Sequence, residues 1–311
     1  MKAIRGGWFW AAALIGALFI FTGTEIVSYL AVLSWAPNSF ATSSEAAMLS
    51  TLIAQLVLAG IGALWYRSLR LSRQRRAIDY GTGRLVSPSQ RVLSKRPLHK
   101  RLTARVILSL LLIGVALQVL VSSILSLIEP LLPDLMNSYD QTISEITDSS
   151  WFSVVSLCIM APLCEELYFR GVCMQLGQRI HPDIRVALVG QGLVFAIAHG
   201  NLVQGSYAFF LGLILGVVSL SQGGLLASMF LHFAVNTSSY SVGILLGAIS
   251  GLGWVGYLLS ALVSLCITAG LLRLLLHPIN GGGLFVGSST YSSQLSGEWR
   301  LHYRHQHGIH G

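Results

Sequence analysis

Charged side chains are scarce in this chain of 311 residues, where Lys, Arg, Asp and Glu together make up 10%. A soluble globular domain carries about 25% charged residues, so secreted, cytosolic and disordered proteins are excluded. Hydrophobic residues, in contrast, make up 53% of the chain. This composition predicts an all-α, polytopic helical membrane protein.

Cysteine is also rare, and all four cysteines lie inside apolar stretches: Cys158, Cys164, Cys173 and Cys266. This placement excludes a disulfide framework and a CxxC metal site. It leaves the redox compartment open.

A helix needs about 20 consecutive apolar residues to cross a bilayer. On that basis we expect about eight transmembrane spans: Trp8–Trp35, Ala46–Tyr66, Val106–Ile128, Trp151–Val172, Val186–His199, Ser206–Ser221, Leu225–Ser250 and Leu252–Leu272. Lys2 and Arg5 precede the first span as in a signal peptide, but its apolar run is too long for one and no clear cleavage site follows. We therefore expect a retained anchor.

The Lys and Arg residues lie on alternate connections between these spans. The segment Arg67–Arg105 holds 12 of the 20, and the others lie before the first span, within Arg170–Arg185 and from Arg273 onward. The intervening connections hold none, and the one at Glu129–Asp148 is acidic. The positive-inside rule therefore predicts a cell-membrane protein with both termini in the cytoplasm.

A concentration of basic residues indicates nucleic-acid binding when it covers a folded surface. Here most of them form one loop, residues 67–105, beside the membrane, and such loops set topology and contact anionic lipid headgroups. We therefore expect membrane lipids, and no nucleic acid, as partners. The Gly-, Ser- and His-rich segment 277–311 is expected to be a flexible cytoplasmic tail; a metal site there is the less favoured alternative.

The fifth and sixth spans are short, with 14 and 16 residues. At about 1.5 Å per residue they reach roughly 21 to 24 Å, less than the ~30 Å hydrocarbon core. The turn His199-Gly200-Asn201 between them is expected to lie within the membrane plane. Polar backbone at that depth must be buried in protein or face a water-filled cavity, so we expect a cavity.

Few ionisable side chains fall within the spans, and each must face the bundle interior or water because it is costly in lipid. They are Glu25, Glu165, Glu166, Arg170, His199 and His232, accompanied by the polar Asn236. Glu25 stands alone near the middle of its span. For it we favour a structural hydrogen bond to a neighbouring helix over a substrate or proton contact.

Two consecutive glutamates in the fourth span have different expected roles. Glu166 and Arg170 are four residues apart, which brings them onto one helix face as an ion pair. Glu165 is rotated about 100° away and is expected to be free. A free, buried carboxylate suits a general base or a metal ligand, although both glutamates could also serve only to hold helices together.

His232 and Asn236 are likewise four residues apart and share a helix face. Counted from the cytoplasmic ends of their spans, Glu165 and His232 each lie roughly 10 Å deep and His199 roughly 20 Å deep. Two histidines, a carboxylate and an amide at compatible depths favour a common site.

These residues resemble the motifs of a known protease family. Glu165-Glu166-Leu167-Tyr168-Phe169-Arg170 matches EExxxR, Phe195 to His199 matches FxxxH, and His232 to Asn236 matches HxxxN. In this order and spacing they are similar to the CPBP intramembrane proteases, which include the CAAX prenyl endopeptidases and the bacterial Abi, or bacteriocin-immunity, proteins. The resemblance covers about Trp151–Tyr240, less than a third of the chain.

The resemblance implies hydrolysis of a peptide bond within or next to the membrane. Glu165 would activate a water together with His199, while His232 and Asn236 would stabilise the oxyanion. Glu166 and Arg170 would support the helix and orient Glu165. A zinc-dependent mechanism stays open, with Glu165, His199 and His232 as the ligands, although the chain has no HExxH motif.

Other classes of activity are less favoured. Cys164 next to Glu165 would suit a Cys-His protease, but helix neighbours point about 100° apart, and a packing role is preferred. A transporter would also place carboxylates and histidines at mid-depth, but the two halves of the chain show no repeat. A non-catalytic scaffold would have lost the catalytic groups, and all are present.

The predicted organisation has three parts. Residues 1–150 hold the N-terminal transmembrane helices and the basic loop, residues 151–276 form the protease core, and residues 277–311 form the tail. The expected substrate is a membrane-associated peptide or protein. Substrate identity and oligomeric state are not encoded in any recognisable pattern.

Overall fold

The computed structural model describes residues 2–35, 44–75, 102–146, 151–180, 183–220 and 224–276. All the elements in these ranges are helices. An all-α chain, expected from the composition, is thus confirmed.

The helices follow one another in three groups. The first group is α1 (Lys2–Trp35), α3 (Ser44–Arg75), α4 (Ala104–Ile128), the 3-10 turn η2 (Glu129–Leu131) and α5 (Pro133–Ile146). The second is one broken helix made of α6 (Trp151–Val154), η3 (Val155–Met160), α7 (Ala161–Glu165), η4 (Glu166–Cys173) and α8 (Met174–Ile180). The third is α9 (Ile184–Ala198), α10 (Leu202–Ser219), α11 (Gly224–Ile249), the 3-10 turn η5 (Ser250–Leu252) and α12 (Gly253–Leu276).

Six helical stretches within the described residues are long and apolar enough to cross a membrane. The last stretch, Gly224–Leu276, contains both α11 and α12, and α9 is a shorter apolar helix of 15 residues. Each of the eight expected spans lies on a helix to within a few residues. The chain is therefore a polytopic helical membrane protein.

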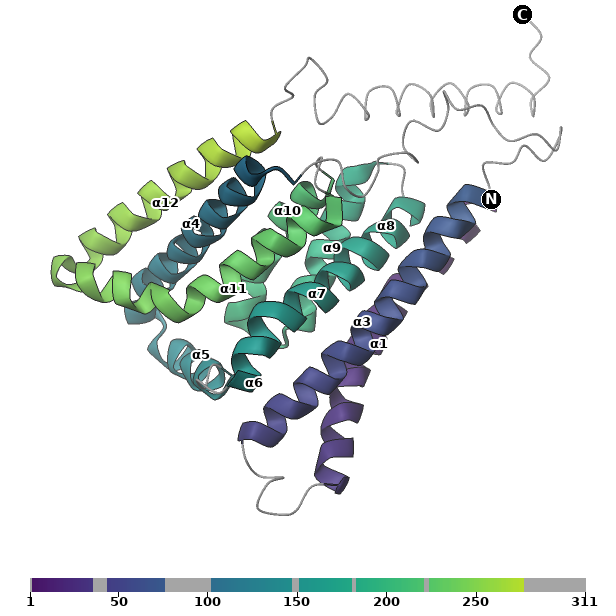
Figure 1. Cartoon of the computed structure of the whole chain (residues 1–311), viewed down its shortest axis with the longest axis horizontal. Helices are drawn as coiled ribbons and strands as arrows, with labels where there is room; N and C mark the ends of the chain where they lie inside the picture. The colour runs from purple at the N-terminus through teal and green to yellow at the C-terminus, as the bar shows by residue number, and fades with distance from the viewer. Residues whose placement is uncertain are drawn as a thin grey trace, which may run out of the picture.

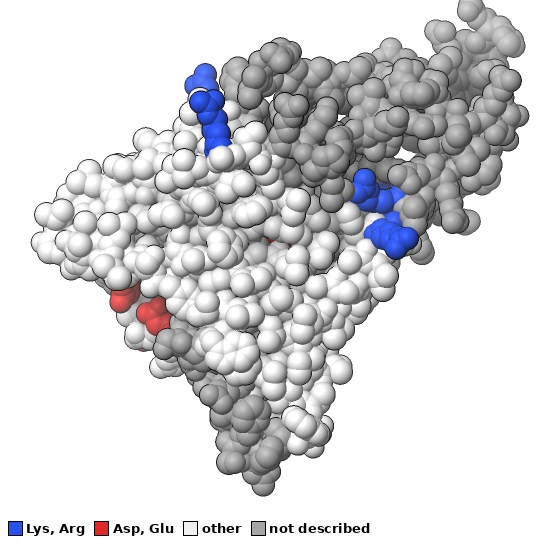
Figure 2. All heavy atoms as spheres, in the orientation of Figure 1, with Lys and Arg blue, Asp and Glu red and all other residues white. Residues whose placement is uncertain are grey.

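The charges are separated along the bundle. In the view of Figure 2 most of the surface carries no charge, with Lys and Arg at one end and Asp and Glu toward the other. Large apolar side chains are exposed on the outer helices, for example Phe19 on α1 and Leu262 on α12. An apolar belt between two polar ends is the surface that a bilayer requires.

The broken helix lies in the middle of the molecule (Figure 1). On one flank α1 packs beside α3, and on the other α4 packs against α11 and α12. The contact of α4 with α11 is close, since a Cβ placed on Gly114 would clash with Ala234. Hydroxyls of Ser123 and Ser260 join α4 to α12 at 2.6 Å.

Proline and two π-helical turns interrupt the central helix. Pro162 stands at the start of α7, directly after the π-helical segment η3, and a second π-helical segment, η4, follows. Proline has no N–H to donate and its ring clashes with the carbonyl four residues earlier in a regular helix. The wider π turn accommodates this, and such turns are frequent at functional sites.

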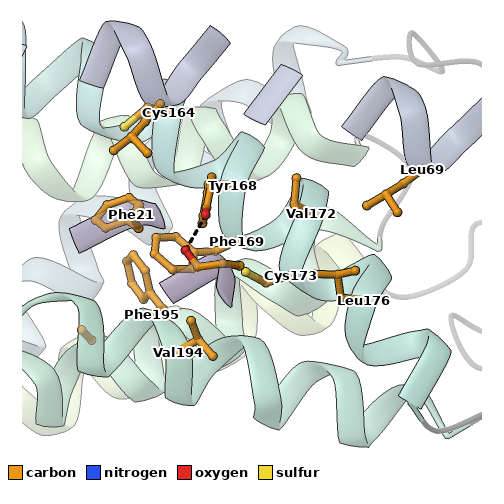
Figure 3. Packing of buried hydrophobic residues seen from close by; sticks show 13 residues of the cluster. Phe21, Leu69, Cys164, Tyr168, Phe169, Val172, Cys173, Leu176, Val194 and Phe195 are labelled. Atoms are coloured by element: carbon orange, nitrogen blue, oxygen red, sulfur yellow. Dashed lines mark hydrogen bonds between the residues drawn. The ribbon is translucent and has the colours of Figure 1, made fainter. Parts of the chain in front are cut away.

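Aromatic side chains pack around η4 (Figure 3). The hydroxyl of Tyr168 donates to the backbone carbonyl of Ala17 on α1, and Phe21, one turn later, packs on Tyr168 and Phe169 with ring centroids 5.5 and 5.1 Å apart. Phe195 of α9 lies 5.0 Å from Phe169. These contacts anchor α1 and α9 to the central helix.

The turn between α9 and α10 falls at His199-Gly200-Asn201, and its depth within the membrane stays a prediction. His199 ends α9, Gly200 has a left-handed backbone with φ of 65°, and Asn201 caps α10 by accepting from the backbone N–H of Gln204. Glycine suits this φ because it has no Cβ.

The acidic connection contains a helix that was not expected. Residues Pro133–Ile146 form α5, whose Met136 and Tyr139 are buried and pack with Val203 of α10. The acidic connection Glu129–Asp148 is thus partly helical. The apolar residues recur every three to four positions, which is the helical signal that the acidic charges obscured.

Residues 76–101, which form most of the basic loop, and the tail 277–311 lie outside the described residues. The expectations for them stay predictions. The division at residues 150 and 276 also stays a prediction.

Candidate active site

A buried ionic network is centred on Glu166. Its Oε1 lies 2.9 Å from Nη1 of Arg170 and 2.8 Å from Nδ1 of His232, and its Oε2 accepts from the hydroxyl of Ser228. Glu166 is completely buried, and Arg170 and His232 are almost completely buried. The expected pair of Glu166 and Arg170 is present, and it extends to α11 through His232 and Ser228.

Glu165 approaches the same imidazole from the other side. Its Oε2 lies 3.8 Å from Nε2 of His232, too far for a direct hydrogen bond. This oxygen is buried and accepts no hydrogen bond from the described residues. His232 is therefore flanked by two consecutive carboxylates, one bonded and one without a hydrogen bond.

His199 reaches the site from the end of α9. Its Nδ1 is 2.7 Å from the carbonyl oxygen of Phe195, one turn back. The ring of Phe195 contacts both imidazoles edge-on, with centroid distances of 4.7 Å to His199 and 6.0 Å to His232. One aromatic ring thus stands against the two histidines, and it also stacks on the guanidinium of Arg170 at 4.3 Å.

Asn236 lies one turn after His232 on α11. Its Nδ2 donates to the carbonyl oxygen of Leu157, in η3, at 2.8 Å. An amide nitrogen carries two hydrogens, so one remains for a ligand. Asn236 makes no direct contact with Glu165 or His199 in the part of the chain that the structure describes.

Glu25 of α1 lies near this site. It interacts electrostatically with Glu165 and with the buried Cys164. The favoured hydrogen bond to a neighbouring helix is not made to any described residue. The expectation of such a bond stays a prediction.

Sequence reasoning missed two groups, Ser228 and the carbonyl of Leu157. Ser228 lies four residues before His232, so helical periodicity places both on the face of α11 that meets Glu166. The role of Ser228 could therefore have been predicted from its spacing to His232. The carbonyl of Leu157 is presented by the π-helical segment η3, which no periodicity indicates.

A zinc site with Glu165, His199 and His232 as ligands does not fit this geometry. Among the described residues, no group of three or more His, Cys, Asp or Glu side chains could hold a metal ion. Each histidine keeps one ring nitrogen available, because its other nitrogen bonds a protein oxygen as is usual in zinc sites, so donor atoms are present and it is the grouping of the side chains that does not fit. No step below passes through a metal.

The segment that holds the site also matches a known protein family. Residues 147–238 match the family model described as type II CAAX prenyl endopeptidase Rce1-like. This confirms the resemblance to the CAAX-type proteases. The matched segment runs from just before α6 into α11 and includes all seven motif residues from Glu165 to Asn236.

The match covers less than a third of the chain. No curated protein and no solved structure matches it. At the family level the Rce1-like segment supports a membrane protease, with membrane lipids around it and a peptide as its substrate.

Proposed function

We propose that the chain is an intramembrane endopeptidase that hydrolyses a membrane-associated peptide or protein, with Glu165 as the general base. This proposal rests on the difference in hydrogen bonding between the carboxylates of Glu165 and Glu166. Glu166 is fully engaged in a buried network, whereas Oε2 of Glu165 is buried, accepts no hydrogen bond from the described residues and faces His232. Such a carboxylate oxygen is suited to accept a proton from a water.

His232 has a defined orientation in this proposal. Because Glu166 pairs with Arg170 it is an acceptor, so Nδ1 of His232 donates to it. Nε2 then faces Glu165. When this nitrogen carries a proton, it is a donor for the oxyanion of the tetrahedral intermediate.

Asn236 and His199 complete the proposed site. The free N–H of the Asn236 amide is a second donor for the oxyanion, because its other hydrogen is used on Leu157. His199 donates through Nδ1 to Phe195, which leaves Nε2 to accept a hydrogen bond from the attacking water beside Glu165.

In the proposed reaction the peptide bond is hydrolysed in two steps. The water oxygen bonds to the peptide carbonyl carbon while Glu165 takes one water proton, and the carbonyl π electrons move to the oxygen. When the carbon–nitrogen bond breaks, the proton on Glu165 passes to the leaving nitrogen. A carboxylic acid and an amine result, and Glu165 is ionised again.

For the orientation of the protein we propose that both termini and the basic loop face the cytoplasm. The described Lys and Arg side chains gather at one end of the bundle and the acidic ones lie toward the other (Figure 2), which supports this orientation by the positive-inside rule.

A hydrolysis assay tests the proposed function. The purified protein is reconstituted in liposomes with a membrane-associated peptide, and the products are analysed by mass spectrometry in water enriched in oxygen-18. We expect a cleaved peptide whose new carboxyl group carries the heavy oxygen, with and without a chelator. Transport of intact peptide, or no turnover of any peptide in a library, would favour a transporter or a scaffold.

A further inference from the structure

Helix α1 is placed on the central helix in a defined register. The hydroxyl of Tyr168 donates to the carbonyl of Ala17, and Phe21 packs on Tyr168 and Phe169. The two helices run in opposite directions (Figure 1), and Figure 3 places Phe21 close to Phe169 and on the side of Cys164. Moving forward along α1 therefore means moving backward along the central helix.

This register brings Glu25 to the level of Glu165. Glu25 follows Phe21 by four residues, so it lies on the same face of α1 and about 6 Å further along the axis. On the central helix, Glu165 precedes Tyr168 by three residues, and it therefore lies at about the same level as Glu25. The two carboxylates interact electrostatically, and each also interacts with Cys164, which is 1% exposed.

Burial distinguishes Glu25 from its neighbours. Its side chain is partly buried, whereas Ile26 and Val27 are 60% and 66% exposed on the outer surface. No described cation or hydrogen-bond donor contacts its carboxyl group, and its charged neighbour is a second carboxylate. Such an arrangement inside a membrane span is unfavourable for stability, and unfavourable local arrangements gather at functional sites.

We propose that Glu25 is a positioning residue of the protease site, acting through Glu165. The proposal rests on the function proposed above. When Glu25 is ionised, its repulsion disfavours conformations of Glu165 that turn toward α1 and favours those that face His232, 3.8 Å away. A group from α1, outside the Rce1-like segment 147–238, thereby helps to orient the general base.

The test uses four full-length variants in the liposome assay: Glu25→Gln, Glu25→Leu, Glu25→Asp and Ser28→Ala. The first two remove the charge, and we expect kcat to fall roughly 10- to 100-fold with KM unchanged, because a misplacement of about 1 Å can cost about 100-fold in rate. Glu25→Asp keeps the charge and should retain more activity than Glu25→Gln. Ser28→Ala, on the buried side of α1, should leave kcat unchanged.

Thermal unfolding of the same variants separates positioning from a structural role. Removing a carboxylate that repels its neighbour should raise the unfolding temperature of Glu25→Gln and Glu25→Leu while kcat falls. The gain should shrink when Glu165→Gln is already present, since that variant has removed the repulsion. A purely structural Glu25 would give lower stability with unchanged kcat, and this result would overturn the inference.

The outcome for Glu25 is distinguishable from the outcome for the proposed function. If wild type cleaves, Glu165→Gln is inactive and all Glu25 variants have wild-type kcat, the inference fails and the protease stands. If Glu165→Gln cleaves as well as wild type, the proposed function fails, and with it the inference that rests on it.

Discussion

At the scale of single residues, the site depends on the different surroundings of two consecutive glutamates. Glu166 is held by Arg170, His232 and Ser228, all buried. Glu165 faces the other nitrogen of the same imidazole without a hydrogen bond. These different surroundings support the proposed division of roles, in which Glu166 holds the helices and Glu165 is the base.

Glu166→Gln should mainly reduce stability. The variant leaves the guanidinium of Arg170 buried without its countercharge, and removing one partner of a buried pair costs about 3–5 kcal/mol. We expect the unfolding temperature measured in detergent to fall clearly. Arg185→Gln, which breaks the exposed pair with Asp183, is the matched control and should leave it unchanged. Equal unfolding temperatures for Glu166→Gln and wild type would contradict the network.

Cys164→Ser should leave peptide cleavage intact. The thiol is 1% exposed, lies 3.5 Å from the carbonyl of Ala161 and belongs to the apolar cluster around η4. It makes no contact with either histidine among the described residues. The measurement is kcat of the folded variant and of wild type treated with a thiol-alkylating reagent. Loss of activity in a stable Cys164→Ser variant would instead indicate a cysteine nucleophile.

The candidate site could be predicted from the sequence only in part. The pairing of Glu166 with Arg170 follows from their spacing. That Glu165 and Glu166 contact opposite nitrogens of one imidazole does not follow, because a regular helix would separate the glutamates by about 100°. Glu166 begins the π-helical segment η4, whose wider turn changes this angle.

At the scale of the elements, the position of α11 depends on how closely α4 approaches it. A Cβ on Gly114 would lie 3.0 Å from the backbone of α11 and still closer to the Ala234 side chain. Ala234 stands between His232 and Asn236 in the sequence. The separation of the two helices therefore affects both proposed oxyanion donors.

Gly114→Ala should push α4 and α11 apart. Overpacking of this kind costs about 1–3 kcal/mol, and kcat should fall because His232 and Asn236 shift with α11. Gly243→Ala, on α11 itself, is the matched control, since its added Cβ meets no atom within 4 Å. Both variants are compared by thermal unfolding and by cleavage rate. If Gly114→Ala behaves like Gly243→Ala, the helices are not in the close contact described.

The elements themselves were largely readable from apolar runs, because a membrane span needs about 20 such residues. Two features were not. Helix α5 was hidden by the acidic residues on its exposed side, although Met136, Tyr139 and Ile143 recur at helical spacing. Pro162 marks a break in the central helix, but the π-helical segments before and after α7 leave no periodic signal in the sequence.

At the scale of the whole molecule, the charge distribution predicts the orientation in the membrane. A reporter fused after His310 should behave as cytoplasmic, and Asp140→Cys, exposed on α5, should react with a membrane-impermeant thiol reagent added from outside. Cysteine-free background variants provide the control. Labelling of Asp140→Cys only after the membrane is permeabilised would reverse the orientation.

The proposed function depends on one base, Glu165, which the bundle of helices presents to the peptide. The most direct measurement is the single-turnover rate of Glu165→Gln on the membrane-associated peptide, with folding verified by thermal unfolding. The side chain keeps its size but takes no proton, so the rate should fall by about 100-fold or more. Near wild-type cleavage by a folded Glu165→Gln protein would contradict the account.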